Sequence, residues 1–577
     1  MARAWLPGLA LLALVPALAA APAPALAQGA RTAAAGQDDP DAPTGGDARS
    51  ARRTSSGASS GGSGGGIVRT TIQPYIEVRQ NFIKELRPGD DTVTYTALAA
   101  GVDAEFGGRY TQGAMSLRYE RRFVEQGDFR NGDSISGLTR IQRDLVRRKL
   151  RIEAGALASR ARVDGSGSAL VNGSRFTDSV TQVYAVYGGP VFSTRVGDVK
   201  LNASYTAGYT KVENKDALQL VPGGPRTDIF DHSLTQTAQV SAGVRPGEVL
   251  PVGLTVNGGY TQEDISNLDQ RIRSLRAGVQ LTVPVTLSLA LVGDAGWEHA
   301  QVASRDALRD ASGNPVIGSD GHYKVDRSQP RKIAYDSNGL TWDVGVIWRP
   351  SKRTSLSAFI GRRYDSTTYY GSFSYNPSPR HALQVSVYDG ISGFGSSLGN
   401  QLRNLPTDFG GSVDPVGGGL TGCGFGQSGG ACLNGPFGSL SSAAFRGRGV
   451  DATYAWTLRR MQLTLGAGYA NRRFIGAPGT VLGIVDGTVS ENWYVNMGVG
   501  APLDARSNFG INVYSAWFRN RQNRLGDSKA FGASASYYRR LTDRLVATAA
   551  LGLDAVNYNV IDDQLILSGQ LGLRYNF

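Results

Sequence analysis

The end of the chain, Leu565 to Phe577, alternates between two kinds of position. Every second residue is apolar or Gly, up to the aromatic Phe577, and the residues between include Gln570 and Arg574. A period of two is that of a β-strand with one apolar and one polar face. Such a strand suits the wall of a membrane β-barrel, where one face meets lipid and the other a polar lumen. The alternative is an edge strand of a soluble β-sandwich that happens to end in Phe.

The same pattern recurs along most of the chain and favours the barrel. From Ile67 on, the sequence predicts 22 strands, at 71–82, 94–106, 111–121, 135–146, 150–162, 178–187, 199–211, 233–245, 252–261, 272–283, 286–297, 339–349, 354–364, 367–375, 381–391, 447–458, 461–471, 489–501, 508–518, 528–540, 544–558 and 565–577. The weakest are 135–146, which alternates poorly, and 367–375, which almost no loop precedes. Because strand number is even in such barrels, we expect 18 to 22.

The predicted connections alternate in length. The connections after odd-numbered strands are mostly long, namely 83–93, 122–134, 163–177, 212–232, 262–271, 298–338, 392–446 and 472–488, and those after even-numbered strands are mostly turns of a few residues. Outer-membrane barrels have long extracellular loops and short periplasmic turns. The fold class predicted is therefore all-β, a transmembrane outer-membrane barrel.

The tryptophans are distributed as this topology requires. Trp297, Trp342, Trp493 and Trp517 fall at the predicted outer rim, and Trp348 and Trp456 at the inner rim. Amphipathic rings gather at the two membrane interfaces, so these residues predict two aromatic girdles.

The N-terminal region predicts export. Arg3 precedes the apolar stretch 6–20, and Ala25-Leu26-Ala27 forms a small-residue cleavage site, so residues 1–27 are predicted to be a signal peptide. Residues 28–66 are rich in Gly and Ser and predict a disordered periplasmic linker, followed by the barrel at 67–577. No later apolar run reaches the roughly 20 residues of a transmembrane helix. No Cys lies just after the cleavage site, which argues against a lipoprotein.

The formal net charge of +12 indicates an anionic partner class. An exported protein rarely meets nucleic acid, so we expect none; lipopolysaccharide or an anionic solute fits better. The expected partners are therefore the lipid bilayer, lipopolysaccharide and the barrel-assembly machinery, together with a polysaccharide or a periplasmic partner.

The chain resembles the outer-membrane porin families of proteobacteria, closest to the group called beta-barrel porin type two. The resemblance rests on the signal, the linker, the paired strands, RRKLRIEAGALASR at 147–160 and the terminal LGLRYNF. It implies an outer-membrane location and, because members often accompany exopolysaccharide systems, a link to surface polymers. It carries over no functional residues. The terminal residues Leu571, Leu573, Tyr575 and Phe577 resemble the signal that barrel-assembly machinery reads.

Few residues suggest chemistry. Cys423 and Cys432 lie close together in a Gly-rich loop of an exported chain, which favours a disulfide over half of a zinc site. Glu298-His299 is the only pair at the outer rim that suggests catalysis, and no Ser-containing elbow accompanies it. The acids between Asp310 and Asp326 lack the spacing of a calcium loop. We therefore expect no enzyme, no metal and no cofactor.

The lumen-facing positions of the predicted strands carry charges of both signs in nearly equal number. The basic ones are Arg79, Arg118, Arg151, Lys200, Arg276, Arg363, Arg540 and Arg574, and the acidic ones are Glu77, Glu120, Glu153, Asp294, Asp343, Asp451 and Asp554. This predicts a charged, wet lumen without strong preference for one sign. The basic excess is expected at turns and rims, including Arg121, Arg122, Arg472, Arg473, Arg519, Arg521 and Arg524.

The predicted function is a porin-like channel for small polar solutes, with loops 298–338 and 392–446 as candidate constrictions. The alternative is a barrel that serves surface-polysaccharide export or envelope organisation without free diffusion. A barrel enzyme acting through His299 at the outer rim is a weaker alternative. A TonB-dependent transporter would need a plug domain of well over a hundred residues before the barrel, and residues 28–66 are too few.

Overall fold

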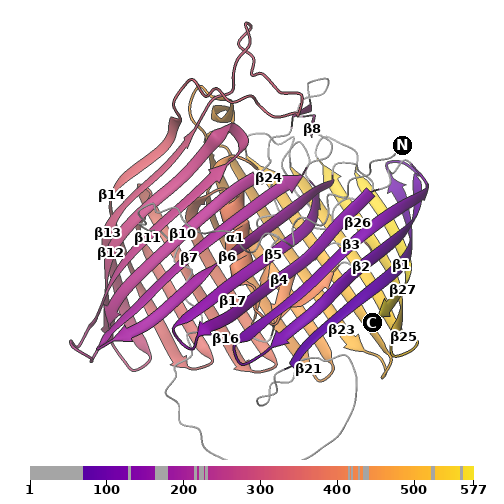
Figure 1. Ribbon diagram of the computed structural model, residues 1–577, viewed down its shortest axis with the longest axis horizontal. Helices are drawn as coiled ribbons and strands as arrows, with labels where there is room; N and C mark the ends of the chain where they lie inside the picture. Colours follow the sequence, from indigo (N-terminus) through magenta and orange to yellow (C-terminus); the bar gives the residue numbers. More distant parts are fainter. Residues whose placement is uncertain are drawn as a thin grey trace, which may run out of the picture.

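The chain folds into a closed barrel of 22 antiparallel strands (Figure 1). The computed structural model describes residues 69–127, 132–162, 180–213, 218–219, 226–227, 232–413, 416, 420–426, 429–432, 441–521, 527–558 and 563–577. The ring closes where β1 (Arg69–Arg87) pairs with β27 (Gln564–Asn576), with Tyr75 opposite Asn576. The predicted fold and strand number are confirmed, including 135–146 and 367–375. The predicted signal peptide and linker lie outside the described residues.

The other strands of the ring follow one another in chain order around the barrel. They are β2 (Thr92–Gly107), β3 (Thr111–Gln126), β4 (Gly132–Val146), β5 (Leu150–Arg162), β6 (Val180–Val196), β7 (Val199–Glu213), β10 (His232–Val244), β11 (Gly253–Ile265), β12 (Gln270–Pro284), β13 (Leu289–Ser304), β14 (Lys332–Ser351), β15 (Thr354–Arg363), β16 (Ser366–Ser378), β17 (His381–Ser392), β21 (Ala444–Leu458), β22 (Met461–Ile475), β23 (Val489–Pro502), β24 (Ser507–Asn520), β25 (Ser528–Arg540) and β26 (Leu545–Tyr558). A two-stranded sheet, β8 (Leu218–Gln219) with β9 (Arg226–Thr227), lies outside the ring.

The alternation in sequence becomes an alternation of faces. On β27, Leu571 is 68% exposed and points outward, whereas Ser568 and Gln570 are buried on the inner face. A strand places successive side chains on opposite faces, so each alternating stretch gives the barrel an apolar outside and a polar inside.

One end of the barrel, here called the turn end, carries only short connections. Its ten turns run from the one at 108–110 to the one at 541–544 and include the two-residue turn Arg459-Arg460. The opposite loop end carries the longer connections, among them 305–331 between β13 and β14 and 393–443 between β17 and β21.

At the loop end the predicted strand boundaries are wrong, because many strands are longer than expected. β1 continues to Arg87, so most of the predicted loop 83–93 is strand, and β14 begins at Lys332 rather than 339. Beyond the lipid-facing region the outer face no longer needs apolar side chains. The alternation therefore fades although the backbone pairing continues.

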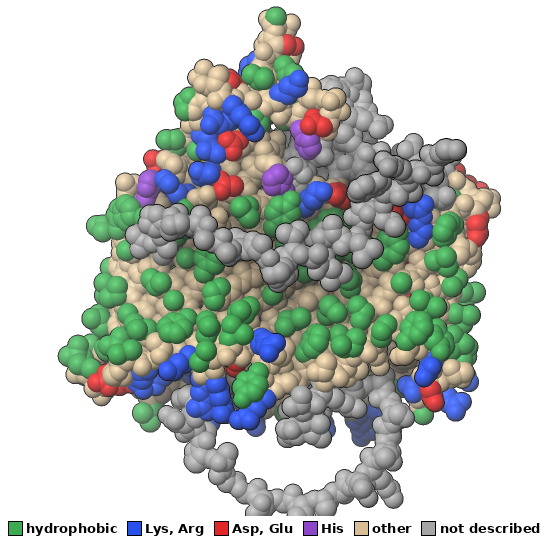
Figure 2. Space-filling view, viewed as in Figure 1, with side chains coloured by type: hydrophobic (Ala, Val, Ile, Leu, Met, Phe, Trp, Pro, Cys, Tyr) green, Lys and Arg blue, Asp and Glu red, His purple; other side chains and the backbone are tan. Residues whose placement is uncertain are grey.

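A belt of apolar side chains crosses the face of the barrel seen in Figure 2, and strands all around the ring carry exposed apolar side chains. Exposed Leu, Val and Ile side chains form it, including Val344 on β14 and Ile360 on β15. Trp342 and Trp297 lie on the loop-end side of this belt, and Trp348 lies toward the turns. Trp342 is mid-strand, so the predicted girdles mark the borders of the belt rather than the ends of strands. Of the described helices, none is long and apolar enough to cross a membrane.

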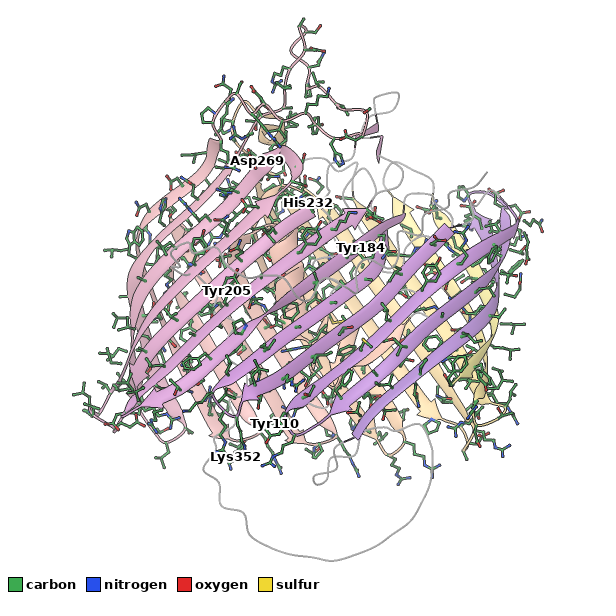
Figure 3. The ribbon with its side chains drawn as sticks, viewed as in Figure 1. Tyr110, Tyr184, Tyr205, His232, Asp269 and Lys352 are labelled. Atoms are coloured by element: carbon green, nitrogen blue, oxygen red, sulfur yellow. A yellow bond between two sulfur atoms is a disulfide. The ribbon has the colours of Figure 1, made fainter. Side chains whose placement is uncertain are left out.

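Charge is unevenly distributed between the two ends. The ten turns and the three strand residues on either side of each carry 18 Lys and Arg against six Asp and Glu. Figure 2 shows blue side chains gathered below the belt, and Figure 3 places Lys352 at this end and Asp269 at the other. At the loop end, two of the predicted rim arginines have acidic partners: Arg121 pairs with Asp133 and Arg521 with Glu491. The basic excess lies mainly at the turn end.

Candidate functional site

A segment of the long connection between β17 and β21 folds into the lumen. It contains α1 (Phe394–Asn404), which lies inside the ring (Figure 1), and a small sheet of β18 (Gly410–Val413), β19 (Leu420–Gly426) and β20 (Gly429–Cys432). We call the described residues from 393 to 432 the lumenal segment. Residues 392–446 were predicted as one of two candidate constrictions, and this one enters the barrel.

One face of α1 packs against an apolar stretch of the inner wall. Phe394, Leu398 and Leu402 recur every four residues and, with Leu405, are at most 1% exposed. They contact inward-facing residues of β3 to β7, namely Ala114, Leu138, Leu157, Val183, Ala185, Tyr187 and Val212. A spacing of four residues puts side chains on one helix face, so burial of this face holds α1 against the wall.

Glu263 on β11 fixes the start of α1. Its side chain is 1% exposed and accepts hydrogen bonds from the backbone N–H groups of Gly393 (2.8 Å) and Ser396 (3.2 Å). The hydroxyl of Ser233 donates a third hydrogen bond, at 2.7 Å. A carboxylate here satisfies N–H groups that the helix leaves unpaired and stabilises the positive end of its dipole. A Cβ at Gly395 would collide with Ser233, so only Gly permits this approach.

The other end of the lumenal segment contacts the opposite wall. Cys423 and Cys432 form a disulfide with an S–S distance of 2.04 Å, which joins β19 to β20. The disulfide packs on Tyr494 of β23 and receives a hydrogen bond from Asn496, Nδ2 to Sγ 3.0 Å. A Cβ on Gly466 of β22 would lie 2.7 Å from Cys432 Sγ. In the ring, β6 is sixth and β23 eighteenth of 22 strands, so the segment bridges the lumen from wall to wall.

The predicted lumen-lining charges lie inside the barrel, and many of them pair with one another. Arg118 bridges Glu77 and Glu120, and Arg79 contacts the same two carboxylates. Arg276 pairs with Asp294 and lies 3.6 Å from Asp343. The side chains in this group are less than a tenth exposed, so this part of the charged wall is shielded from solvent, whereas the side chain of Arg151 is 45% exposed.

The remaining predicted lumen residues have varied surroundings. Arg363 pairs with Glu298, and Arg151 with Asp144 (3.0 Å) and Glu153 (4.0 Å). Asp451 accepts hydrogen bonds from the Tyr494 hydroxyl (2.5 Å) and from Gln401 of α1 (3.3 Å). Arg540 lies at the turn end of β25.

One residue at this site, Glu263, could not be picked out from the sequence as functional. Glu263 sits in an ordinary polar stretch, and no local pattern marks it. The apolar spacing of α1 was present in the predicted loop. A second signal was the inner face of β6, where Val183 and Ala185 are apolar although a barrel lumen is normally polar.

The catalytic and metal alternatives find no support in the geometry. Glu298 points inward to Arg363, whereas His299 lies outside beside Trp297, with ring centroids 6.2 Å apart. Adjacent residues of a strand face opposite sides, so they do not form the predicted rim pair. Among the described residues, no group of three or more His, Cys, Asp or Glu is placed to hold a metal ion.

Comparison with known proteins yields structural likeness only. No protein-family model and no curated protein matches the chain. The FrpB iron transporter from Neisseria meningitidis aligns over 88% of this chain and 82% of its own, with 12% identity and a TM-score of 0.41. The ferric-catecholate import receptor Fiu from E. coli in its open form aligns over 87% and 81%, with 9% identity and a TM-score of 0.43. The copper transporter OprC aligns over 89% of this chain and 81% of its own, with 12% identity and a TM-score of 0.37. Identities below 25% and TM-scores below 0.5 assign neither a family nor an activity.

Proposed function

We propose that the chain is an outer-membrane barrel that conducts small polar solutes and that the lumenal segment is its gate. The apolar belt between two Trp girdles supports the membrane location. The long connections at the loop end and the short turns at the other support an orientation with the turns in the periplasm.

The observation that carries the proposal is that the lumenal segment spans the lumen. Its helix α1 packs on strands β3 to β7, and its disulfide packs on strands β22 and β23. A barrel of this size is wide enough for an aqueous channel or a plug. Here the obstruction comes from a connection between two adjacent strands. Such a connection can be displaced without opening the barrel wall, which is what a gate requires.

The test is single-channel conductance in planar bilayers. Replacing 394–440 by a short Gly-Ser linker leaves the ring intact, because Ser392 and Phe445 are already opposite each other on β17 and β21. We expect wild-type protein to conduct weakly or intermittently and the variant to conduct several-fold more and steadily. A matched control replaces 311–321, the tip of the connection between β13 and β14, which projects away from the barrel (Figure 1).

Absence of conductance in both wild type and the 394–440 variant, with the barrel shown to be folded, would contradict the proposal. The chain would then fit the second candidate, a barrel for surface-polysaccharide export or envelope organisation without free diffusion. The segment across the lumen is also what that function requires. Loss of surface polymer in a deletion strain would support it.

A further inference from the structure

The charged residues of the inner wall are concentrated on some strands and rare on others. The inner face of β1 alone carries Glu77, Arg79 and Glu85. The strands β15 to β17 and β21 to β25, all of whose residues the structure describes, have only four charged side chains at inward positions, namely Arg363, Asp451, Arg472 and Arg540. We call the inner surface of these eight strands the low-charge sector.

Most other inward positions of the low-charge sector carry small residues or uncharged hydrogen-bonding side chains. Among them are Ser357, Gln384 and Asn512, which are partly exposed. Because the ring is closed and these side chains point inward, their exposed surface borders the lumen. The side of α1 that faces away from its apolar contacts has the same character, with Ser397 and Asn400 partly exposed.

Aromatic side chains interrupt this polar surface, and five of them are partly exposed toward the lumen. They are Phe359, Tyr370, Tyr388, Tyr514 and Tyr538. Three of the rings lie across a glycine directly opposite on the neighbouring strand, Phe359 across Gly345, Tyr388 across Gly449 and Tyr514 across Gly532. A Cβ at any of these glycines would collide with the ring. Each ring therefore lies along the wall, with one face toward the backbone and the other toward the lumen.

Three of these aromatic residues lie side by side on consecutive strands. Tyr370 on β16 stacks on Phe359 of β15, with ring centroids 4.9 Å apart and 12° between the planes. Gly371 pairs with Val387, which places Tyr370 beside Tyr388 on β17. We call Phe359, Tyr370 and Tyr388 the aromatic patch. Toward the turn end it is bordered by the hydroxyls of Ser357 and Ser372, which lie 3.0 Å apart.

A sugar matches this combination of groups. The faces of a sugar ring carry C–H groups, which the negative face of an aromatic ring attracts, and its rim carries hydroxyls that exchange hydrogen bonds with Ser, Asn and Gln. An ionic solute finds few partners here, because Arg363 is paired with Glu298 and Asp451 is hydrogen-bonded to Tyr494. A purely apolar solute would displace water from the polar side chains without replacing its hydrogen bonds.

We propose that the channel conducts neutral sugars along the low-charge sector and that they bind at the aromatic patch on their way. The proposal rests on the proposed function and names its solute class. The patch lies next to the gate, because β17 contacts α1 and because Gln401 of α1 reaches Asp451 on the adjacent strand β21. A sugar chain bound at the patch therefore lies beside the lumenal segment.

The test measures binding to the full chain purified in detergent by saturation-transfer NMR and, separately, block of the current in planar bilayers. The probes are maltohexaose, a polyethylene glycol of similar mass, which is neutral but has no rings, and hexagalacturonate, which carries a carboxylate on every ring. We expect maltohexaose to bind saturably, to receive saturation from aromatic protons at its C–H groups and to interrupt the current. Polyethylene glycol should do neither, and hexagalacturonate should bind about tenfold more weakly.

Substitutions of Tyr370 locate the site. Tyr370→Ser removes one ring of the patch and should weaken maltohexaose binding about fivefold, as expected for the loss of one aromatic contact. Tyr370→Phe keeps the ring and should bind maltohexaose nearly as well as wild type. Tyr369→Ser is the matched control, because it removes the neighbouring tyrosine from the outer face of the same strand and should leave binding unchanged.

Equal binding of polyethylene glycol or hexagalacturonate would overturn the proposal. Unchanged maltohexaose binding in Tyr370→Ser, or an equal loss in Tyr369→Ser, would overturn it as well. Conductance separates this proposal from the one on which it rests. A conducting barrel that binds no maltohexaose refutes only the sugar site. A folded barrel that binds maltohexaose, but conducts neither as wild type nor after replacement of 394–440, refutes only the channel.

Discussion

At the scale of single residues, the interior is organised by charges that satisfy each other and one carboxylate that satisfies backbone. Many arginines of the wall have acidic partners across one or two strands, as Arg446 has in Asp389 through two contacts of 2.8 Å. Removing one member of such a buried pair is costly, because it leaves the other charge desolvated and unpaired. Glu263 differs in that its partners are N–H groups and a hydroxyl. It therefore stabilises a position of the lumenal segment rather than the wall.

Glu263→Ala should loosen the lumenal segment without opening the ring. The substitution leaves the N–H groups of Gly393 and Ser396 unpaired, at a cost of about 2–4 kcal/mol to the docked state of α1. We expect more frequent opening in single-channel recordings and faster hydrogen exchange of 394–404. Glu105→Gln at the turn end is the control, and identical gating in the two variants would show that Glu263 does not hold the segment.

Asp269 should make the stability of the connection 305–331 depend on pH. Burial would raise the pKa of Asp269, but hydrogen bonds from Arg331 (2.6 Å) and Arg305 (2.9 Å) outweigh it, and the pKa lies below its usual value. Stabilisation by a carboxylate with a lowered pKa is complete above its unfolded pKa of about 4 and is lost as the pH falls. We therefore expect proteolysis of 305–331, by an acid-active protease, to accelerate below about pH 4.

The Asp269→Asn variant checks this assignment. It should be cleaved quickly already at neutral pH and show little further change on acidification. Asp320→Asn, at the tip of the same connection, should keep the wild-type pH profile. Protection of the Asp269→Asn variant equal to wild type would assign the pH dependence to another group.

At the scale of elements, strands that face lipid were predictable and those that leave it were not. Trp342 to Trp348 alternates because lipid selects one face, and this stretch was located correctly. Residues 332–338 of the same strand carry polar groups on the outer face, Asp336 and Asn338 among them, and read as loop. Their pairing with β13 is a tertiary contact that no local pattern encodes.

The lumenal segment shows a second limit. The position of Cys423 and Cys432 nine residues apart suggested their pairing, but nothing near them indicated Tyr494 and Asn496 on β23 as neighbours. The contact between α1 and β6 joins residues that are more than two hundred positions apart. The sequence held only indirect signals, the four-residue spacing of α1 and the apolar inner face of β6, and these become readable only when considered together.

Deletion of Phe577 should impair assembly more than stability. The side chain is 65% exposed, and its main contacts are the ring of Tyr575 at 5.2 Å and a backbone hydrogen bond to Pro74. The closed barrel therefore loses little. We expect surface levels to fall while the inserted fraction conducts normally. Leu503→Ala, an exposed apolar residue in a turn, is the control, and normal surface levels of the Phe577 deletion would refute a role in assembly.

At the scale of the whole molecule, the barrel is electrically polar along its axis. When the three strand residues on either side are counted with each connection at the turn end, Lys and Arg equal or outnumber Asp and Glu at nine of the ten. The tenth, around 285–288, is uncharged. Because this excess is spread around the circumference directly beside the apolar belt, it faces lipid head groups on all sides. Basic groups at a membrane surface each contribute roughly 1 kcal/mol of attraction to an anionic leaflet, and salt screens it.

Insertion into anionic vesicles should therefore depend on the turn-end cations. Replacing Arg147, Arg148, Lys149, Arg459 and Arg460 by Gln is expected to slow insertion into phosphatidylglycerol vesicles several-fold and to reduce its salt dependence. Insertion into phosphatidylcholine should not change. Lys324→Gln with Arg327→Gln, at the loop end, is the control. Equal slowing by both sets would mean that total charge, and not its position, governs insertion.

The adjacency of Ser392 and Phe445 has a consequence for how such a molecule can diversify. The lumenal segment leaves the wall at one strand and returns at the next, so its length and sequence can change without altering the register of any strand pair. Recombination within this connection would replace the lumenal segment as one unit and leave the outer surface of the barrel unchanged. The inner faces that contact the segment, those of β3 to β7, β10, β11 and β21 to β23, would need to follow. In descendants of this chain, variation should concentrate there, while the outer surface stays constant.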